Sequence, residues 1–420
     1  MMGKPRAIIV GGSISGLACA HSLGGAGWDV VVVEKASGLA HSGSSTGAGL
    51  GLDRHSCRVL AQWLTEQTLL HGSLPLKVDQ NQATDSEKKV CWTLARDDDF
   101  GFRAAHWGDL HALLYYSLPP QTVLWGHHFL SFQRSQEGVQ AQVEIIETDS
   151  VIKIVGDLLV AADGCLSAIR RHFFPDHKLS RYLGYSAWRG VLDFSENEYS
   201  DIILGLRRVY PELGNCLYFD LAQGTHCVIY EIQNKRINWI WYVNQPEPQS
   251  KGNSMTVKVR GDMVEKMHQE AEKAWVPELA RLMKETKEPF INIMYDSDPL
   301  VRLSWDNVVL VGDAAHPTSP HGLRSTNMSI LDAWVLGHSL RKSGVENLGL
   351  ALKEYESLRL PVVSKQVLHS RHLGRLKQGF LFSPPHSFPW KNAGPEEREE
   401  LLQRKMPFFE EIPLPGDILS

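Results

Sequence analysis

The sequence has no long apolar run, no closely spaced cysteines and no excess of basic residues. A transmembrane helix needs about 18 to 20 consecutive apolar residues, and no stretch reaches that length, so we expect no membrane span. The apolar run Ala7–Val10 follows Met1 so closely that we expect no targeting segment, which favours the cytoplasm. The six cysteines form no Cys-x-x-Cys pair, which argues against a zinc site or a disulfide framework and favours a reducing compartment.

The charge balance also excludes a class of partner. The net charge of -5 and the pI of about 6.4 provide no basic surface of the size that a nucleic acid requires, so none is expected as a partner. No cluster of histidine and acidic residues has the spacing of a zinc or non-haem iron site, so we expect no metal. The composition, 43% hydrophobic and 22% charged, is typical of a globular protein, and 420 residues suffice for two or three domains.

What the sequence does have, close to its start, is a strand, turn, helix and strand pattern. Ala7–Val10 is a short run rich in β-branched residues, Gly11–Gly16 is a turn, and Leu17–Leu23 has a helical pattern. A second apolar run, Val30–Val33, ends in Glu34. Continuous apolar runs are typical of strands that are buried on both faces, so the pattern predicts a βαβ unit of a parallel sheet.

The turn in this unit is a candidate dinucleotide site. A helix that begins after a glycine turn offers free N–H groups to a pyrophosphate, and a carboxylate about 20 residues further on can accept hydrogen bonds from a ribose. Ser13 replaces the second glycine of the G-x-G-x-x-G pattern, so a purely structural turn is the alternative. Glu34 disfavours a 2′-phosphate, which leaves NAD or FAD. The candidate cofactor-binding residues are Gly11, Ser13, Ile14, Ser15, Gly16, Glu34 and Lys35.

Two later segments help to decide between NAD and FAD. In "GDLLVAADGCLSAIRR" an apolar strand runs into Asp163 and Gly164, and a basic helix follows. Further along, the strand Val308–Val311 is followed by Gly312 and Asp313. Ligands of parallel α/β sheets bind beyond the carboxyl ends of the strands, where these carboxylates can accept hydrogen bonds from a polyol chain.

The three elements, in this order, resemble the single-component (group A) FAD-dependent aromatic monooxygenase family with the p-hydroxybenzoate hydroxylase fold. The resemblance covers roughly residues 6 to 365. The stretches "GGSISG", "HWGDLHALL", "GYSAWRG" and the pair Pro320 and His321 are similar to the 2,6-dihydroxypyridine 3-monooxygenase-like branch. The resemblance therefore implies an α/β fold, with a doubly wound Rossmann-like FAD domain, an inserted antiparallel sheet and C-terminal helices.

The resemblance also implies the cofactor and the chemistry. FAD is expected to bind non-covalently, NAD(P)H to reduce it, and O2 to form a C4a-hydroperoxide that hydroxylates a small, electron-rich aromatic or heteroaromatic substrate. The first turn would hold the ADP part, the Asp-Gly pair would lie near both FAD and the nicotinamide donor, and the Gly-Asp pair would contact the ribitol. The later residues implied at the FAD are Asp163, Gly164, Gly312, Asp313, Pro320, Ser325 and Thr326.

Two departures from the family pattern keep other functions open. Trp107 stands where many relatives carry an arginine that touches FAD. Leu323 and Arg324 replace part of a glycine-rich turn whose N–H groups face the flavin, although Ser325 and Thr326 can supply the donors of a helix start. The alternatives are an FAD-binding module that has lost hydroxylation, and a NAD dehydrogenase that uses the first motif alone.

The segment between the last two motifs predicts the substrate domain. "CVIYEI" and "INWIWYV", separated by a turn at Gln233–Lys235, predict a β-hairpin, in which Trp239 and Trp241 share one face. These tryptophans belong to the core or line a pocket. Arg189, beside Trp188, either holds an anionic phenolate or carboxylate or forms a structural ion pair.

Two histidines near the expected flavin loop are candidates for substrate chemistry. His321 and Arg189 are the candidate catalytic residues, and His321 would orient the substrate or move its phenolic proton. For His316 we favour a structural role in the loop after Gly312 and Asp313.

The expected domains are discontinuous in sequence. Residues 1–75, 100–178 and 290–345 form the FAD-binding domain, residues 76–99 and 179–289 the substrate domain, and residues 346–420 a C-terminal helical segment and Pro-rich tail. The tail is expected to wrap the outside of the fold, with a helix from Pro395 to Lys405, and either a monomer or a homodimer is compatible with it. Two further expectations are a polar loop at Asp79–Lys89 and one helix at Gly261–Thr286.

Overall fold

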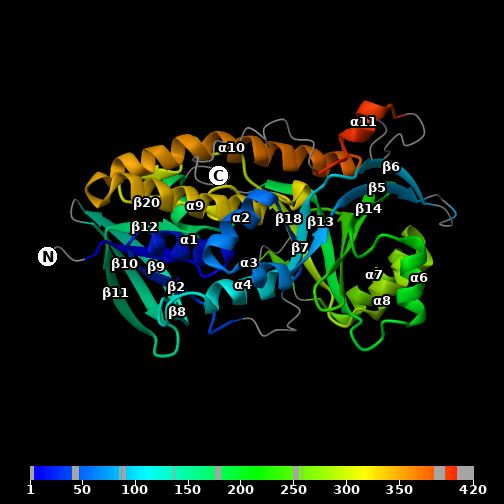
Figure 1. Cartoon of the computed structure of the whole chain (residues 1–420), viewed down its shortest axis with the longest axis horizontal. Helices are drawn as coiled ribbons and strands as arrows, with labels where there is room; N and C mark the ends of the chain where they lie inside the picture. The colour runs from blue at the N-terminus through cyan, green and yellow to red at the C-terminus, as the bar shows by residue number, and fades with distance from the viewer. Residues whose placement is uncertain are drawn as a thin grey trace.

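The computed structural model describes residues 4–39, 47–84, 87, 91–135, 138–175, 181–248, 255–257, 259–382 and 393–403. Two large sheets lie toward opposite ends of the long axis of the molecule (Figure 1). The helix α10 (Leu348–Lys377) runs along much of that axis (Figure 1). In the part of the chain so described, no helix is long and apolar enough to cross a membrane.

The first sheet has six strands in the order β19-β20-β12-β1-β2-β8, and all neighbouring pairs are parallel except β19 with β20. Ala7, Ile8 and Ile9 of its central strand are completely buried, as the apolar run predicts. The strands are β1 (Arg6–Val10), β2 (Asp29–Glu34), β8 (Val123–Trp125), β12 (Leu158–Ala161), β19 (Ser304–Trp305) and β20 (Val308–Leu310).

Helices and a small sheet cover this first sheet. The helix α1 (Ile14–Gly25) contacts β1 and β2 and packs on α9 (Ser325–Ser343). An antiparallel sheet of β9, β10 and β11 contacts the same two strands and β12, so both faces are shielded from water. The remaining elements here are α4 (Trp107–Tyr116), β9 (His127–Ser135), β10 (Gly138–Ile145), β11 (Ser150–Gly156) and α5 (Ala168–Phe173).

The second sheet has eight strands in the order β17-β18-β13-β16-β15-β14-β5-β6. Neighbouring strands are antiparallel, apart from β14 with β5. The predicted hairpin is confirmed, because Ile232 pairs with Arg236 across a turn whose central residues, Asn234 and Lys235, have φ of 61° and 53°. The strands are β5 (Val78–Thr84), β6 (Cys91–Asp97), β13 (Arg181–Asp193), β14 (Cys216–Ala222), β15 (Thr225–Ile232), β16 (Arg236–Asn244), β17 (Thr256–Val257) and β18 (Phe290–Asp296).

Three helices, α6 (Asp201–Val209), α7 (Gly261–Ala274) and α8 (Pro277–Glu285), pack on the face of this sheet that carries Trp239 and Trp241. These tryptophans are therefore core residues. The expected single helix Gly261–Thr286 is wrong, because the backbone is extended between α7 and α8. A proline disfavours the helical conformation in the residue before it, and Pro277 therefore ends the first helix and begins the second.

The expected polar loop at Asp79–Lys89 is also wrong over most of the part that the structure describes. Residues 78–84 form β5, and Asp79 and Asn81 are completely buried. Lys377 of α10 donates a hydrogen bond to Asn81, and Asn81 Nδ2 donates one to Asp79 Oδ1 at 3.2 Å. Polar side chains tolerate burial when they have such partners, and these partners come from distant parts of the chain. Residues 85, 86 and 88–90 lie outside the described residues.

The remaining elements join the two large sheets. A three-stranded sheet in the order β3-β7-β4 contacts α9 on the side of the first sheet and β15 of the second sheet. Its strands are β3 (Gly49–Leu52), β4 (Ser73–Leu76) and β7 (Phe102–His106). The helices α2 (Arg54–Trp63) and α3 (Glu66–His71) accompany it. The C-terminal helix α11 is shorter than expected, Pro395–Glu399, and Gln403 beyond it is completely buried, so this part of the tail does not simply wrap the outside. Residues 404 and 405 of the expected helix lie outside the described residues.

Candidate functional site

The three predicted turns meet at one edge of the first sheet. Strands β20, β12, β1 and β2 are neighbours and run parallel, so their carboxyl ends lie side by side. A cavity of about 410 Å³ opens there and extends to the second sheet. The predicted residues that line it are Ser13, Ile14, Ser15, Gly164, Arg189, Asp313, Pro320, His321, Ser325 and Thr326.

The first turn is packed too closely for side chains at its glycines. A Cβ at Gly16 would lie 1.8 Å from the carbonyl oxygen of Gly11, and a Cβ at Gly11, whose φ is +105°, would lie 2.3 Å from the carbonyl oxygen of Ala162. Ser13, in the second glycine slot, is exposed at the mouth of the turn and lines the cavity. The serine substitution is therefore compatible with a ligand at the start of α1.

The carboxylate of Glu34 holds the turn in place. Its Oε2 accepts a hydrogen bond from Gly12 N at 2.6 Å, and its Oε1 accepts one from Ala36 N at 2.8 Å. Each carboxylate oxygen has a second lone pair, which can accept a hydrogen bond from a ribose hydroxyl. Lys35 is exposed and does not line the cavity.

Two buried oxygen atoms at this edge lack a partner within the described residues. They are Ser15 Oγ and Asp163 Oδ1. The other carboxylate oxygen of Asp163 accepts hydrogen bonds from Ala168 N at 2.8 Å and Ile169 N at 3.3 Å. Buried polar atoms are normally hydrogen-bonded, so a polyol or diphosphate ligand that supplies the missing partners fits these residues.

Arg170 joins the second and third turns. Its Nη1 donates to the carbonyl oxygens of Asp313 and Ala314, both at 2.9 Å, and its Nη2 donates to that of Cys165 at 2.5 Å. The side chain is buried, and this burial lowers the pKa of the guanidinium. The sequence indicated a basic helix here, but nothing in it distinguished Arg170 from its exposed neighbour Arg171.

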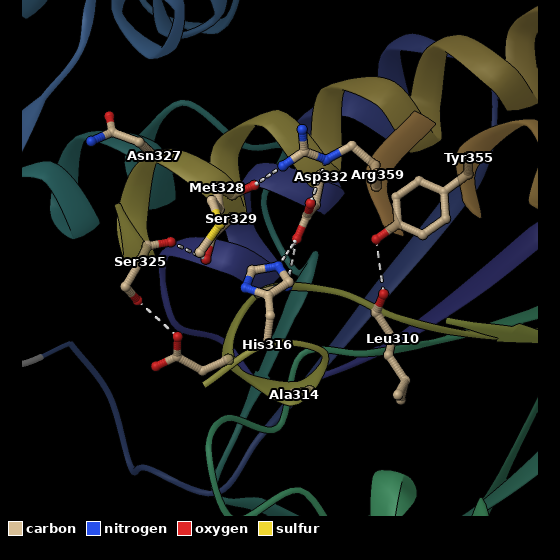
Figure 2. A network of polar contacts seen from close by, with 12 residues as sticks. Leu310, Ala314, His316, Ser325, Asn327, Met328, Ser329, Asp332, Tyr355 and Arg359 are labelled. Atoms are coloured by element: carbon tan, nitrogen blue, oxygen red, sulfur yellow. Dashed lines mark hydrogen bonds and ion pairs between the residues drawn. The ribbon is translucent and has the colours of Figure 1, made fainter. Parts of the chain in front are cut away.

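Asp332 of α9 holds the third turn in place through hydrogen bonds (Figure 2). Its carboxylate accepts hydrogen bonds from Gly312 N at 2.9 Å, from His316 Nε2 at 2.5 Å and from Arg359 Nε at 2.7 Å. Burial raises the pKa of Asp332, but the electrostatic attraction of His316 and Arg359 and the hydrogen bonds outweigh it and lower the pKa to about 2. His316 thus has the structural position that the sequence favoured.

The start of α9 faces the cavity beside this turn. Ser325 Oγ donates a hydrogen bond to Asp313 Oδ1 at 2.7 Å. Before the helix, Leu323 has a φ of 55°, which lies in the left-handed region that favours glycine. Leu323 replaces part of a glycine-rich turn of the family that the sequence resembles. Arg324 Nη1 donates to Asp53 Oδ2 at 2.5 Å in a buried ion pair, so its charge is balanced within the protein. Trp107 lines the cavity and stacks on His111, with ring centroids 4.8 Å apart.

The second sheet closes the other side of the cavity with aromatic and apolar side chains. Phe219, Val228, Tyr230, Ile240 and Tyr242 line it from the face opposite Trp239 and Trp241, as the two-residue period of a strand requires. This wall has the size and apolar character that hold a small aromatic ring.

Arg189 lies on the same wall. Its Nη1 donates to Asn292 Oδ1 at 3.3 Å and its Nη2 to the carbonyl oxygen of Gly49 at 3.4 Å, while its buried Nε has no partner among the described residues. Among the described residues no carboxylate forms an ion pair with Arg189, in contrast to the alternative in which Arg189 belongs to a structural ion pair. Burial raises the pKa of Tyr230 and of Tyr242. The charge of Arg189 is close enough to both hydroxyl groups to offset part of this rise.

His321 forms a buried pair with His226, a residue that sequence reasoning missed. The two Nε2 atoms are 3.0 Å apart, and His321 Nδ1 is 3.0 Å from Ser319 Oγ. Burial, and to a smaller extent the charge of Lys377, lowers the pKa of His321 to about 3, and burial lowers that of His226 well below its ordinary value. Both rings are therefore neutral near pH 7.

The hydrogen-bond network assigns the protons on this pair. Gln378 Nε2 donates to Asn244 Oδ1 at 2.7 Å, which directs Gln378 Oε1 toward His226 Nδ1, also at 2.7 Å. His226 Nδ1 is then the donor, its Nε2 accepts from His321 Nε2, and His321 Nδ1 is left as an acceptor. Local sequence offered no signal for this arrangement, because its members lie on β15, β16, α10 and the loop before α9.

Comparisons with known proteins point in the same direction as the geometry. Residues 4–192 and 235–370 match the model of a family described as the FAD binding domain. The chain is 28% identical to 3-amino-4-hydroxybenzoate 2-monooxygenase PtmB3 of Streptomyces platensis, over 97% of this chain and 94% of that protein. It is 25% identical to 6-hydroxynicotinate 3-monooxygenase of Bordetella bronchiseptica, over 87% of this chain and 90% of that protein.

Solved structures share the fold. Klebsiella pneumoniae HpxO complexed with FAD and uric acid is similar with a TM-score of 0.75 and 20% identity, over 95% of this chain and 94% of that chain. The 2,6-dihydroxypyridine-3-hydroxylase from Arthrobacter nicotinovorans is similar with a TM-score of 0.75 and 21% identity, over 93% of this chain and 97% of that chain.

Proposed function

Since this chain belongs to the FAD binding domain family and is an FAD-dependent monooxygenase, we propose that its substrate is a small aromatic ring with a hydrogen-bond-accepting group that lies against Arg189. The enzyme uses NAD(P)H and O2 to hydroxylate small aromatic substrates. The observation that carries the proposal is the continuity of the cavity, which begins at the three turns and ends at the aromatic wall of the second sheet.

The turns are the proposed FAD site. The start of α1 with Ser13 and Ser15 would bind the diphosphate, Glu34 the ribose, and Asp163 and Asp313 the polyol chain. When bound, FAD supplies the redox and oxygen-transfer chemistry, and the protein orients the substrate and excludes water. Gly11 and Gly16 would act by allowing the backbones to approach, and Gly312 by leaving room for the side chains of Ser15 and Ser329. Gly164, Pro320, Ser325 and Thr326 would border the flavin.

The wall around Arg189 supports an acceptor-bearing substrate. Arg189 lines the cavity and can only donate hydrogen bonds, and its buried Nε has no partner among the described residues. A carboxylate or phenolate would satisfy such a donor. Two of the relatives act, by their names, on a hydroxybenzoate and a hydroxynicotinate, which carry this group on an aromatic ring.

His321 is the proposed contact that orients the substrate ring. Both of its ring nitrogens have partners within the protein, Nε2 at His226 and Nδ1 at Ser319 Oγ, so the imidazole is held where it lines the cavity and would position the substrate by contact. Because the pKa of His321 is about 3, the ring stays neutral between pH 5 and 9, and its hydrogen bonds to His226 and Ser319 hold it in one orientation throughout that range.

The test of the proposed function is a substrate screen on the FAD-loaded protein. We expect 4-hydroxybenzoates or hydroxynicotinates to stimulate NAD(P)H oxidation and to yield a product with one added oxygen atom, detected by mass spectrometry. Stimulation by neutral phenols, with none by the acids, would contradict the role of Arg189. The alternative of a binding module without hydroxylase activity, motivated by Leu323 and Arg324, would be supported if the flavin binds but no tested ring is hydroxylated.

Replacing Asp313 by alanine is expected to weaken FAD binding about 10- to 100-fold, because one charge-assisted acceptor is worth roughly 1.5 to 3 kcal/mol. The measurement is a fluorescence titration of the apoprotein with FAD. Ser325→Ala serves as the control, since it removes the hydrogen bond to Asp313 but keeps the carboxylate, and its effect should be smaller. Full flavin occupancy in Asp313→Ala protein would count against the assignment.

Replacing His321 by alanine is expected to slow product formation at least about tenfold while FAD content stays unchanged, because the variant loses the ring contact that orients the substrate. The rate should be compared with that of His128→Ala, which removes a half-exposed histidine on β9. Equal rates in the His321 variant and the wild type would remove His321 from the mechanism. A step between pH 5 and 8 that disappears only in His321→Ala would contradict its depressed pKa.

We also propose a division of the chain and a setting for it. Residues 1–75, 100–178 and 290–345 would form the FAD-binding domain, residues 76–99 and 179–289 the substrate domain, and residues 346–420 a C-terminal segment. A cytoplasmic, reducing environment is supported by the five cysteines the structure describes as free thiols. The negative net charge argues against a nucleic-acid partner. Light scattering would distinguish a monomer from a homodimer.

A further inference from the structure

The end of the C-terminal segment 393–403 is inserted into the fold. Leu401 and Gln403 have no exposed surface, and Ala393 is buried as well. Leu401 belongs to an apolar cluster that includes Leu94 of β6 and Leu373 of α10. A segment that only covered the surface would not bury a glutamine completely, so the position of Gln403 requires an explanation.

Gln403 connects two parts of the chain that are far apart in sequence. Its main-chain N donates a hydrogen bond to Asp79 Oδ2 at 2.7 Å. Its side-chain Oε1 accepts a hydrogen bond from Gly322 N at 2.8 Å. One residue of the C-terminal segment thus holds both the buried strand β5 and the loop in front of α9.

Gly322 lies between two residues that line the cavity, His321 and Leu323. These three residues form a short 3₁₀ turn in which Gly322 and Leu323 have φ of 78° and 55°. Left-handed conformations at two successive residues need support from surrounding contacts. The hydrogen bond to Gln403, a residue that does not itself line the cavity, provides such support.

The other anchor of Gln403 lies behind the aromatic wall of the cavity. Asp79 accepts a hydrogen bond from Asn81, and Asn81 accepts one from Lys377. The Lys377 Nζ lies 3.4 Å from the centroid of the Phe219 ring, and Phe219 lines the cavity. Gln403 therefore ties the flavin-side loop to a buried polar network that packs on the substrate-side wall.

We propose that Gln403 is a positioning residue for the hydroxylation reaction. By accepting the hydrogen bond of the Gly322 amide, it fixes the 321–323 turn so that His321 and Leu323 keep their places against the substrate. The 393–403 segment thereby acts as the outer support of the active-site wall. This inference rests on the proposed function for its effect on catalysis, whereas the positioning of the loop is independent of it.

The first experiment measures the loop directly by hydrogen–deuterium exchange and mass spectrometry on the FAD-loaded, full-length protein. Gln403→Met keeps the length of the side chain but removes the acceptor, and Gln403→Glu keeps the acceptor. We expect the peptide that contains Gly322 to exchange at least about tenfold faster in Gln403→Met and close to the wild-type rate in Gln403→Glu. The control is Glu396→Gln, an exposed position on α11. Unchanged exchange in Gln403→Met overturns the proposal.

A second experiment separates positioning from general damage to the fold. With a substrate from the screen, we expect Gln403→Met to raise KM and to divert at least about threefold more NAD(P)H to hydrogen peroxide, while FAD affinity stays within about twofold. In that diversion NAD(P)H, O2 and a proton yield NAD(P)+ and H2O2, with both electrons passing to oxygen and none to the ring. Gln403→Glu should restore KM and coupling. Faster exchange without either kinetic change overturns the catalytic role.

Two further outcomes are also decisive. If Gln403→Met does not accumulate as folded protein, Gln403→Asn, which withdraws the acceptor by one methylene, is expected to show the same faster exchange and is measured in its place. If no compound in the screen is hydroxylated, the proposed function fails, and the exchange experiment still decides whether Gln403 positions the loop.

Discussion

A Gly16→Val protein is expected to retain almost no FAD and to unfold at a much lower temperature than the wild type. Even the first carbon of a side chain at this position would lie 1.8 Å from the carbonyl oxygen of Gly11, and that atom is backbone that cannot move without displacing the turn. Relief of the clash would push α1 away from β1 and withdraw its N-terminus from the cavity. The measurements are the flavin-to-protein absorbance ratio after purification and the midpoint of thermal unfolding.

The same helix offers a matched control. Gly24, near the end of α1, would place its Cβ in open space, with no heavy atom from elsewhere in the described part of the chain within 4 Å. Gly24→Ala should therefore bind FAD normally and gain up to about 1 kcal/mol of stability from the higher helix propensity of alanine. If the Gly16 variant carried a full complement of flavin, the close packing of this turn would not be the reason for its glycine.

Replacing Asp332 by alanine should have the second large effect, a loss of about 3 to 5 kcal/mol in the free energy of unfolding together with release of FAD. The substitution leaves Arg359 buried without its carboxylate partner and removes the acceptor of Gly312 N and His316 (Figure 2). The turn that carries Asp313 would then lose its support. Denaturant unfolding of the apoprotein gives the stability change, and the FAD titration gives the change at the site.

A surface ion pair serves as the comparison for Asp332. Asp98 pairs with Arg96, and its side chain is 73% exposed, so Asp98→Asn should cost less than about 1 kcal/mol. Similar losses in the two variants would mean that burial of the Asp332 network does not matter.

The low pKa of Asp332 also predicts a dependence on pH. The folded-state pKa of about 2 lies below the ordinary value of 3.8, so the ionised carboxylate stabilises the fold fully above about pH 4. This contribution, about 2 kcal/mol, should be lost as the pH falls from about 4 to about 2. In Asp332→Asn protein the slope of unfolding free energy against pH should be smaller in that window. An unchanged slope would contradict the low pKa.

The local sequence pattern was sufficient to predict those elements whose structural neighbours are close in sequence. The βαβ unit from Arg6 to Glu34 and the hairpin of β15 and β16 appear where the apolar runs and turn residues place them. Pairs such as Asp163-Gly164 and Gly312-Asp313 were identified because each follows an apolar strand. Parallel strands bring their carboxyl ends together in any doubly wound sheet, so the motifs implied one shared site before its geometry was known.

Expectations failed where burial depended on distant partners. The sequence predicted a polar loop at Asp79–Lys89, where the structure has the strand Val78–Thr84, because the periodicity of an apolar face is absent when buried residues are polar. The partners that permit burial of Asp79, Lys377 on α10 and Gln403 in the C-terminal segment, lie about 300 residues away. The division of the expected helix 261–286 is different, since Pro277 is a local signal that was available in the sequence.

The sequence by itself determined the family, the cofactor and the three turns at one edge of the first sheet, because those features depend on short motifs with a steric or electrostatic requirement at each position. Only the tertiary structure decided how the turns are held and what the substrate meets. Arg170, Asp332, His226 and Gln403 act through hydrogen bonds to residues on other elements. Such contacts arise when the chain closes on itself, and a buried polar group is stable only where that closure supplies its partner.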